Sequence, residues 1–528
     1  MSRTSRLIAV VVVVAMVVGG AAVALVASLT GTGGMGGGGA FTPAPTTRPQ
    51  PGASQAPSSG LQRFYGQTID WGACADATSG STEECGTITV PIDYENPGGA
   101  TIKLALLRVP AAKPSERIGS LVVNPGGPGA PGTQYAAQAK AAFRQPILDH
   151  YDIVGFDPRG TGSSDPIDCL PDSQLDSFLA ADPDPDTSAE ATALTRGLAA
   201  FYRGCVQRSD SLIGHVTTVE TARDMDVLRS ALGETRLAYF GASYGTKLGA
   251  TYADLFPKHT GRFVLDGAVD VSLDFRQLAL GQARGFETAL RAYVADCVTS
   301  SSCPLGSSVE EGLKTITDLV ASTDSDPLPT GDDARPLTEA LAFYGLITPL
   351  YNRDYWPVLT QSLALALRGN GAALLQLADI YASRNADGTY ADNSAQAIYA
   401  INCLDDPASI APSQVAAQIP AFEKASPTFG RVFAWGLVGC RGIQVKATET
   451  DDSITAAGAP PIVVVGTTRD PATPYAWAVS LAKQLKSGVL VSRDGDGHTG
   501  YNAGNTCVDE AVEGYLVDGT VPKGGLSC

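Results

Sequence analysis

The sequence predicts an α/β fold, in which a mostly parallel sheet of about eight strands carries helices on both faces and a large helical cap. Three observations lead to this prediction. Short apolar runs alternate with helical stretches along most of the chain. One of these runs enters a Gly-x-Ser-x-Gly turn that leads straight into a helix-compatible segment. A long Ala- and Leu-rich stretch between Asp266 and Pro461 contains no comparable runs, so we expect it to form a cap above one edge of the sheet.

Eight short apolar runs, which alternate with helical stretches, are expected to form the sheet. They are Thr87–Pro91, Lys103–Val109, Ser120–Asn124, Asp152–Phe156, Leu237–Phe240, Arg262–Leu265, Ile462–Val465 and Gly488–Val491. The segment Glu220–Leu232 has the spacing of an amphipathic helix, which would pack on the sheet just before the fifth strand. Residues 359–382 show the helical pattern expected of the cap.

The turn Gly241-Ala242-Ser243-Tyr244-Gly245 is the most informative motif of the chain. An apolar strand precedes it and a helix-compatible segment follows, which is the context that a nucleophile elbow requires. Gly241 and Gly245 remove side chains that would clash around such a strained turn. A chain with 58 Gly also contains this pattern by chance, but the context favours Ser243 as a nucleophile exposed at the end of the sheet.

A serine hydroxyl is a weak nucleophile unless a histidine acts as its base and an acid orients that histidine. The chain has four histidines, namely His150, His215, His259 and His498. The first two precede Ser243, whereas the family of elbows with this motif places the histidine late in the chain. His259 stands at an expected helix end. His498 lies in a Gly-rich loop directly after the last expected strand, and we therefore predict that it is the base.

The acid has two candidates, each at the end of an expected strand. Asp470 follows the apolar run Ile462–Val465 and lies nearest before His498, which is the order expected for this elbow. Asp266 ends an earlier strand, but it precedes a glycine and also suits an ordinary turn. The sequence favours Asp470 as the acid.

An oxyanion hole would need two backbone N–H groups. One is expected from Tyr244, directly after the nucleophile, and the other from Gly127, in the Gly-rich loop Asn124–Gly129 after an apolar strand. The alternative is that this loop is an ordinary tight turn. In a third loop, Asp157 and Arg159 are interpreted as scaffolding residues that hold the loops together.

The N-terminus predicts export across the cytoplasmic membrane. Arg3 and Arg6 precede an apolar run from Leu7 to Leu29, which is longer than the apolar part of most signal peptides. Ala22-Val23-Ala24 offers a cleavage site, so a cleaved signal and a membrane anchor through residues 7–29 both stay open. In either case the enzyme is expected to be extracellular or at the cell surface.

Five parts are predicted along the chain. Residues 1–29 are a signal peptide or signal anchor, and residues 30–60, rich in Gly, Pro, Ser and Thr, are a flexible linker. Residues 61–270 and 459–528 are the N- and C-terminal parts of the sheet-containing core. Residues 271–458 are the helical cap.

Ten cysteines in an exported chain indicate disulfides. Pairing between neighbours in the sequence is our hypothesis, namely Cys74–Cys85, Cys169–Cys205, Cys297–Cys303, Cys403–Cys440 and Cys507–Cys528. The region from Cys169 to Cys205 is a further candidate part of the cap. A zinc site is the alternative, but the chain has no Cys-x-x-Cys pair and few histidines, so no metal and no cofactor is predicted.

The net charge of −17, with no basic stripe to offset it, excludes nucleic acid as a partner. An acidic field attracts substrates that carry a free amino group. The acidic runs Asp182–Asp186 and Asp494–Gly497 lack the full spacing of a calcium-binding loop, and they are interpreted as solvated turns.

The motifs occur in an order that resembles a known family. They are the loop Asn124–Gly129, the segment Asp157–Gly160, the turn Gly241–Thr246, the run Asp470–Pro474 and the loop at Gly497-His498. Together they resemble the α/β-hydrolase peptidases related to prolyl iminopeptidase. Those enzymes usually carry His-Gly-Gly-Pro-Gly in the first loop, whereas this chain has Asn-Pro-Gly-Gly-Pro-Gly. That form is similar to the secreted tripeptidyl-aminopeptidase-like branch from actinobacteria, as is the C-terminal segment Ser492–Cys528.

The resemblance implies an α/β-hydrolase fold and a serine aminopeptidase that releases tripeptides, or short N-terminal units, from peptides with a free N-terminus. A cap carboxylate would hold the substrate ammonium, because a buried ammonium needs a paired acid. The resemblance favours Asp405 for this role, and Asp406 and Glu287 are the other candidates. Two alternatives stay open: a cell-envelope esterase or lipase with the same triad, and a catalytically silent hydrolase-fold binding protein.

Overall fold

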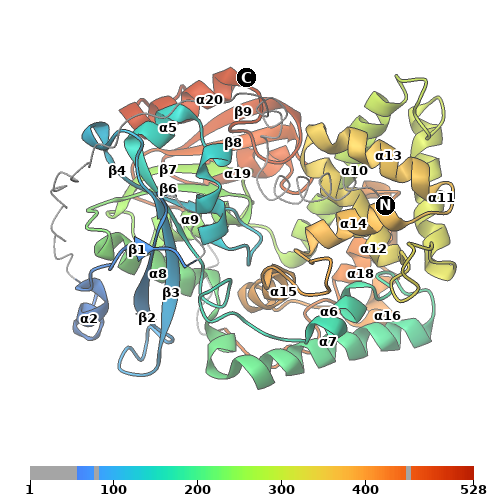
Figure 1. Cartoon of the computed structure of the whole chain (residues 1–528), viewed down its shortest axis with the longest axis horizontal. Coiled ribbons are helices and arrows are strands. Elements are labelled where there is room, and N and C mark those ends of the chain that lie inside the picture. Colours follow the sequence, from blue (N-terminus) through green and yellow to red (C-terminus); the bar gives the residue numbers. More distant parts are fainter. Residues whose placement is uncertain (1–55, 76–81, 448–453) are drawn as a thin grey trace, which may run out of the picture.

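The computed structural model describes residues 56–75, 82–447 and 454–528 (Figure 1). A sheet with its covering helices makes up one part of the molecule, and a group of helices lies beside it. The predicted signal or anchor at residues 1–29 lies outside the described residues, as does most of the predicted linker. Within the described ranges, no helix is both long enough and apolar enough to cross a membrane.

The sheet has ten strands in the order β1-β2-β3-β5-β4-β6-β7-β8-β9-β10. The first three pairings are antiparallel, and every pairing from β5–β4 onward is parallel. The strands are β1 (Gly72–Ala73), β2 (Glu84–Pro91), β3 (Thr101–Val109), β4 (Gly119–Asn124), β5 (Tyr151–Phe156), β6 (Leu237–Ala242), β7 (Thr260–Asp266), β8 (Ile462–Arg469), β9 (Gly488–Asp496) and β10 (Leu526–Ser527). The eight expected strands are all present, which confirms the predicted fold class. The two additional strands, β1 and β10, are short edge strands.

Helices bury both faces of the central strands. Three of them are α8 (Thr218–Ala231), which is the helix predicted at Glu220–Leu232, α9 (Tyr244–Leu255) and α20 (Thr506–Glu513). In β4, Val122 packs in the cluster that contains α8 and α9, whereas Leu121 and Val123 pack in the cluster that contains α20. This alternation follows from the two-residue period of a strand. Burial on both faces also explains why the run is apolar throughout.

Helices fill the long segment between β7 and β8, and the described residues there add no strand to the sheet. They include α10 (Phe275–Cys297), α11 (Val309–Ser325), α12 (Glu339–Ile347), α13 (Trp356–Ala366), α14 (Ala372–Tyr381), α15 (Ser394–Asp405), α16 (Pro412–Val415), α17 (Ile419–Ala425) and α18 (Gly430–Gly436). Many of their apolar residues, such as Leu290, Ile316 and Leu346, form a hydrophobic cluster separate from that of the sheet. The helical cap is therefore present, and the domain boundaries predicted from the sequence stay predictions.

Two helices that precede the sheet strand β6 extend this cap. Figure 1 shows α6 (Asp172–Leu179) and α7 (Ser188–Ser209) running along one side of the cap helices, below α15 in that view. Gln396 of α15 accepts the N–H groups of Cys169 and Leu170 just before α6, at 2.8 and 2.9 Å. The region from Cys169 to Cys205 therefore contacts the cap, as its sequence suggested.

All ten cysteines are paired in disulfides. The pairs are those between sequence neighbours, so the predicted connectivity is confirmed. The bond between Cys507 and Cys528 links α20 to the residue after β10, which holds the C-terminal strand beside β9. The disulfides thus fix surface segments on both the core and the cap.

Candidate active site

Ser243 occupies the sharp turn between β6 and α9, with backbone angles φ 56° and ψ −124°. A positive φ is strained for serine and persists only where the surrounding structure enforces it. The end of β6 and the start of α9 lie very close together, since a Cβ on Gly241 would lie 2.3 Å from the Gly245 carbonyl oxygen. Thr246 closes the turn by donating from its N–H and its hydroxyl to the Ser243 carbonyl oxygen. This is the geometry of a nucleophile elbow.

Asp470 and His498 meet at the same edge of the sheet, after β8 and β9. His498 Nδ1 lies 2.9 Å from each carboxylate oxygen of Asp470. The carboxylate also accepts the backbone N–H groups of Ala472, Thr473 and Thr499. An acid held in this way orients the imidazole and favours the tautomer with the proton on Nδ1, which leaves Nε2 free to act as a base.

His498 Nε2 is buried and has no hydrogen-bond partner among the described residues. His498 and Ser243 line the same cavity. The cap residue Tyr351 helps to hold the base, because its carbonyl oxygen accepts the His498 N–H and its ring packs edge-on against the imidazole at 5.3 Å between centroids. No pattern in the sequence indicates this contact. The unpaired Nε2 is thus the atom available to take a proton from a nucleophile.

The electrostatic surroundings of His498 favour its charged form. Burial lowers the pKa of the imidazole, but the charge and hydrogen bond of Asp470, together with the charge of Asp266, outweigh burial and raise the pKa above its ordinary value. A histidine whose protonated form is stabilised is a stronger proton acceptor when it is neutral.

Asp266 ends β7 and is fully buried, but it does not contact the imidazole. Its two carboxylate oxygens accept the N–H groups of Gly500 and Tyr501, each at 2.8 Å. Burial raises the pKa of Asp266 to about 6. Of the two candidate acids, Asp470 is therefore the one that contacts His498. Asp266 instead holds the loop that follows His498, at Gly500 and Tyr501.

The loop after β4 passes directly over the elbow. A Cβ on Gly126 would lie 2.8 Å from the Ser243 Cβ and 3.0 Å from the Tyr244 nitrogen, and Gly126 has a φ of +100° that also favours glycine. Neither the Tyr244 N–H nor the Gly127 N–H donates a hydrogen bond to another described residue. Both are therefore available to an oxyanion. Sequence reasoning selected Gly127 but missed Gly126, which sets how closely the loop approaches.

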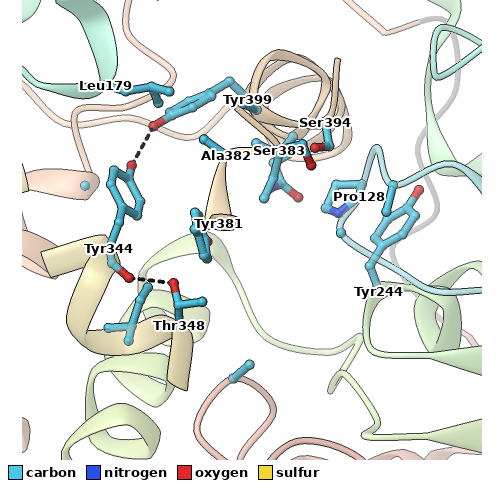
Figure 2. A pocket seen from close by; sticks show the side chains of 18 of the residues that line it. Pro128, Leu179, Tyr244, Tyr344, Thr348, Tyr381, Ala382, Ser383, Ser394 and Tyr399 are labelled. Carbon is cyan, nitrogen blue, oxygen red and sulfur yellow. Dashed lines mark hydrogen bonds between the residues drawn. The ribbon is translucent and has the colours of Figure 1, made fainter. Parts of the chain in front are cut away.

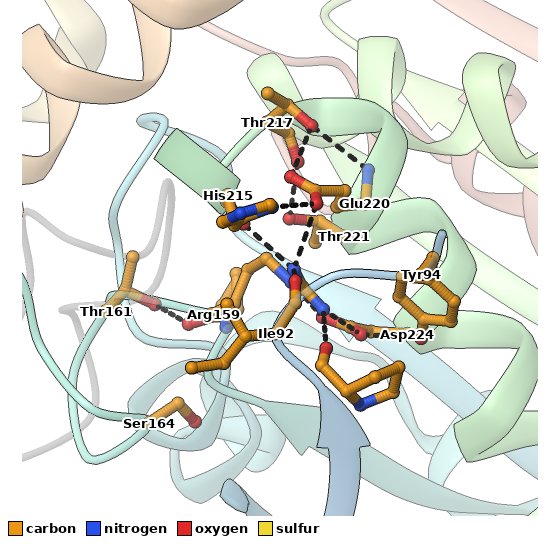
Figure 3. A network of polar contacts seen from close by, with 12 residues as sticks. Ile92, Tyr94, Arg159, Thr161, Ser164, His215, Thr217, Glu220, Thr221 and Asp224 are labelled. Atoms are coloured by element: carbon orange, nitrogen blue, oxygen red, sulfur yellow. Dashed lines mark hydrogen bonds and ion pairs between the residues drawn. The ribbon is translucent and has the colours of Figure 1, made fainter. Parts of the chain in front are cut away.

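A buried network surrounds Arg159, in the loop after β5 (Figure 3). The guanidinium donates two hydrogen bonds of 2.7 Å to Asp224 of α8. It also donates to the carbonyl oxygens of Pro91, Ile92 and His215 at 2.8 to 2.9 Å. Because these acceptors compensate a fully buried charge, Arg159 ties the end of β2 to α8 and to its own loop after β5. The network fits the interpretation of Arg159 as scaffolding.

The other three histidines have contacts elsewhere. The Nδ1 atoms of His150, His215 and His259 lie 2.7, 2.7 and 2.8 Å from oxygens of Pro146, Glu220 and Asp226. None of the three lines the cavity that contains Ser243. The arrangement leaves His498 as the histidine that the site can use as a base.

The cavity has a volume of about 950 Å³ and lies between the sheet edge and the cap. Most of its lining is apolar or aromatic. Figure 2 shows Tyr344 and Tyr399 of the cap on one side, with their hydroxyl oxygens 3.4 Å apart, and Tyr244 of the elbow on the other. A space of this size accommodates a small organic molecule or a short peptide segment.

The carboxylate of Asp405, expected to bind a substrate ammonium, is already paired. It lies 2.7 Å from Lys247 Nζ and accepts the N–H and hydroxyl of Thr218. Asp405 is also not among the residues that line the cavity. A carboxylate neutralised by a lysine has little attraction left for a second cation. The structure therefore argues against Asp405 in this role, and shows it joining α15 to α8 and α9.

The two other cap candidates differ in position. Asp406 lines the cavity, and its carboxylate accepts the N–H groups of Phe275 and Ala408, each at 3.0 Å. Glu287 of α10 does not line the cavity and accepts the hydroxyl of Ser426 at 2.9 Å. Asp406 is the one of the two whose side chain a ligand in the cavity can reach.

Comparison with known proteins identifies close relatives. A family model described as TAP-like protein matches residues 426–528. The serine protease Hip1 of Mycobacterium tuberculosis is 37% identical over 486 residues, which cover 88% of this chain and 91% of that protein. Carboxylesterase B of the same organism is 39% identical over 491 residues, covering 91% and 93%. The tripeptidyl aminopeptidase of Streptomyces lividans is 33% identical over 480 residues, covering 87% and 86%.

Proposed function

The chain belongs to the TAP-like family of α/β-hydrolase serine peptidases, and we propose that it releases tripeptides, or other short N-terminal units, from peptides with a free N-terminus. The observation that carries this proposal is the arrangement of His498. Its Nδ1 contacts Asp470, its Nε2 has no hydrogen-bond partner among the described residues, and His498 lines the same cavity as Ser243. That arrangement supports acyl transfer through Ser243 as nucleophile, His498 as base and Asp470 as the orienting acid.

The reaction would proceed in two stages. In the first, His498 Nε2 accepts the proton of the Ser243 hydroxyl as Oγ bonds to the scissile carbonyl carbon. The protonated imidazole then gives this proton to the leaving amine as the C–N bond breaks, which leaves an acyl-enzyme. In the second stage, water attacks the ester, His498 again accepts and returns the proton, and the free acid leaves. Asp470 stabilises the imidazolium each time it forms.

The N–H groups of Tyr244 and Gly127 would hold the oxyanion that develops in both stages. Neither donates elsewhere among the described residues, so no existing bond has to break before the reaction. Loss of one such donor costs about 3 kcal/mol of transition-state stabilisation in other enzymes. The cap would exclude water from the acyl-enzyme and limit which chains enter.

A free N-terminus would need a carboxylate inside the cavity. Four cavity-lining carboxylates have no ion-pair partner among the described residues, namely Asp182, Asp266, Asp392 and Asp406. By contrast, Asp176 and Asp379 also line the cavity but are paired with Arg384 and Arg335. Asp266 holds the loop after β9, and Asp182 meets two other carboxyls outside the cavity. We therefore expect the substrate ammonium to bind at Asp392 or Asp406.

We propose that the enzyme acts outside the cytoplasmic membrane. Five disulfides form and persist in an oxidising compartment. The run from Leu7 to Leu29 is the proposed export signal. The N-terminal sequence of the mature protein separates the two outcomes, since a cleaved signal removes this run and an anchor retains it.

The decisive experiment compares substrates on the purified protein, with Ser243→Ala as control. The substrates are a free-amine tripeptide anilide, its N-acetylated twin, single-residue anilides and a short-chain nitrophenyl ester. Fast cleavage of the free tripeptide, with loss on acetylation, is the expected result. Ser243→Ala should keep the wild-type melting temperature and lose about 10⁶-fold in kcat. Substantial residual activity in this variant would identify a different nucleophile.

Esterase activity is the second candidate, because one of the relatives with high identity is named carboxylesterase B. The same triad and oxyanion donors serve ester and amide bonds. Cleavage of the nitrophenyl ester alone, with no effect of a free amine, would establish the esterase and rule out the peptidase. If a fluorophosphonate probe fails to label Ser243, the chain is a silent binding protein instead.

A further inference from the structure

Three carboxylates from separate segments converge beside the cavity. Asp182 lies in the connection between α6 and α7, Asp324 lies near the end of α11, and Glu339 is the first residue of α12. One oxygen of each lies within 4.8 Å of the others. No segment supplies more than one of these groups, so a sequence motif could not have revealed the cluster.

Glu339 is buried in this cluster, and one of its carboxyl oxygens has no hydrogen-bond partner among the described residues. The residue is only 8% exposed, and the oxygen without a partner is Oε2. A buried polar atom normally has a partner, and carboxyl groups packed together need protons or a cation to offset their charges.

The nearest arginine does not supply that cation. Arg431 of α18 pairs with Asp184 and Asp186, at 2.9 and 2.6 Å. The acidic run at 182–186, interpreted from the sequence as a solvated turn, is therefore packed against the cap, and the carboxyls of Asp182, Asp324 and Glu339 stay without an ion-pair partner among the described residues.

We propose that Asp182, Asp324 and Glu339 bind a calcium ion. Carboxylate oxygens are the ligands that hard divalent cations prefer, and no nitrogen or sulfur ligand is present in the cluster. Ca²⁺ accepts irregular sets of carboxylate and water oxygens, at about 2.4 Å from each. Mg²⁺ demands a stricter octahedron and usually keeps several of its waters, so a set of three protein carboxylates favours Ca²⁺. Water completes the coordination on the side of Asp324, whose side chain is exposed.

The position of the cluster favours an ion over the substrate ammonium. Asp182 lines the cavity, but Asp324 and Glu339 do not. A substrate inside the cavity would therefore reach one of the three carboxylates, whereas an ion entering from the solvent at Asp324 reaches all of them. Once bound, the ion ties the α6–α7 connection, which forms part of the cavity wall, to the cap helices α11 and α12.

The test measures calcium binding and thermal unfolding of the whole protein after treatment with EDTA. Calorimetric titration with CaCl₂ is expected to show one saturable site per chain, with a rise in melting temperature. Glu339→Gln and Asp324→Asn should weaken binding at least tenfold and lose that rise. Asp326→Asn is the matched control, since Asp326 is an exposed carboxylate next to the same helix end but outside the cluster. It should bind as the wild type does.

Several results would overturn the proposal. Absence of saturable binding at millimolar CaCl₂ is one, and equal binding by all variants is another. Preference for Mg²⁺ over Ca²⁺ would refute the choice of ion. If Glu339→Gln instead raises KM for a free-amine tripeptide anilide while Ca²⁺ neither binds nor stabilises the wild type, the cluster binds the substrate ammonium. Since binding and unfolding are measured without turnover, the same titrations on Ser243→Ala keep this test independent of the proposed activity.

Discussion

Asp470 and Asp266 are buried carboxylates at the ends of neighbouring strands, and their contacts assign them different tasks. The carboxylate of Asp470 contacts the imidazole of His498 and accepts three backbone N–H groups. The carboxylate of Asp266 accepts the N–H groups of Gly500 and Tyr501. The first carboxylate thus acts on the base itself, and the second acts on the loop that carries the base.

This difference predicts the pH dependence of an Asp470→Asn variant. His498 must be neutral to accept a proton, so activity rises as pH rises through its pKa. In the wild type, the pH at which activity reaches half its maximum should lie above the ordinary pKa of histidine, because Asp470 raises the pKa of His498. Asp470→Asn removes the larger of the two charges that raise the pKa of His498, and leaves burial, which lowers it, opposed by the smaller effect of Asp266. The rise of kcat/KM with pH should therefore occur at lower pH in this variant, and kcat should fall by about 10⁴-fold.

Asp266→Asn is the matched control for this measurement. The substitution replaces one acceptor oxygen by an NH₂ group that faces a backbone N–H, so the loop loses a hydrogen bond. Kinetics should show a smaller fall in kcat than in Asp470→Asn, since the imidazole keeps its acid. If Asp266→Asn costs more activity than Asp470→Asn, the two assignments are reversed.

At the residue scale, the predictable parts of the site are those that a local pattern encodes. Ser243, Asp470 and His498 each follow a recognisable strand, and parallel strands place their carboxyl ends at one edge. The pairing of Asp405 with Lys247 joins residues 158 positions apart. No local pattern specifies such a contact, because tertiary packing of α15 on α9 creates it.

Among the elements, the loop after β4 has the most demanding contact with the elbow. The Cβ of Gly126→Ala would lie 2.7 Å from the Ala242 carbonyl oxygen and 2.8 Å from the Ser243 Cβ, which forces the loop away from the turn. Because Gly127 follows in the same loop, its N–H would shift away from the oxyanion. We expect kcat to fall at least about 10²-fold, the cost of losing one donor. Steady-state kinetics and thermal unfolding of the variant test this.

Gly331→Ala controls for backbone strain. Gly331 has a φ of +87°, close to the +100° of Gly126, but a Cβ there meets no atom within 4 Å. Both alanines suffer the strain of a positive φ, about 1 kcal/mol. Only Gly126→Ala should lose activity. Equal losses in both variants would show that strain and unfolding, not the approach to the elbow, account for the effect.

At this scale, the length of an element decides how well the sequence predicts it. The eight longer strands have enough residues to show an apolar pattern, whereas the two-residue strands β1 and β10 have none. Residues 359–382, where the sequence showed a helical pattern without helix boundaries, belong to two helices, α13 and α14, because Gly369-Asn370-Gly371 separates them. Gly369 has a φ of +82°, which ends a helix and which glycine adopts without strain.

For the molecule as a whole, the sheet core and the cap each have a hydrophobic cluster, and the cavity lies where they meet. The presence of a cap was predictable from the Ala- and Leu-rich stretch between Asp266 and Pro461. Its contacts were not, since the cluster of Asp182, Asp324 and Glu339 depends on how three separate segments pack. Fold class is thus encoded in repeated local patterns, whereas the cavity wall is encoded in long-range packing.

The net charge of −17 predicts how salt affects the whole enzyme. A negative field attracts cationic substrates and loses range as ionic strength rises, because the screening length shrinks from about 30 Å at 0.01 M salt to about 8 Å at 0.15 M. Two free-amine tripeptide anilides that differ only in a Lys or a Glu side chain form a matched pair. From low to physiological salt, kcat/KM should fall several-fold for the Lys peptide and much less for the Glu peptide. Both peptides share the same catalytic step, so any effect of salt on His498 cancels in their ratio. An unchanged ratio would mean that entry to the cavity is governed by the local carboxylates and the shape of the lining, and not by the charge of the molecule.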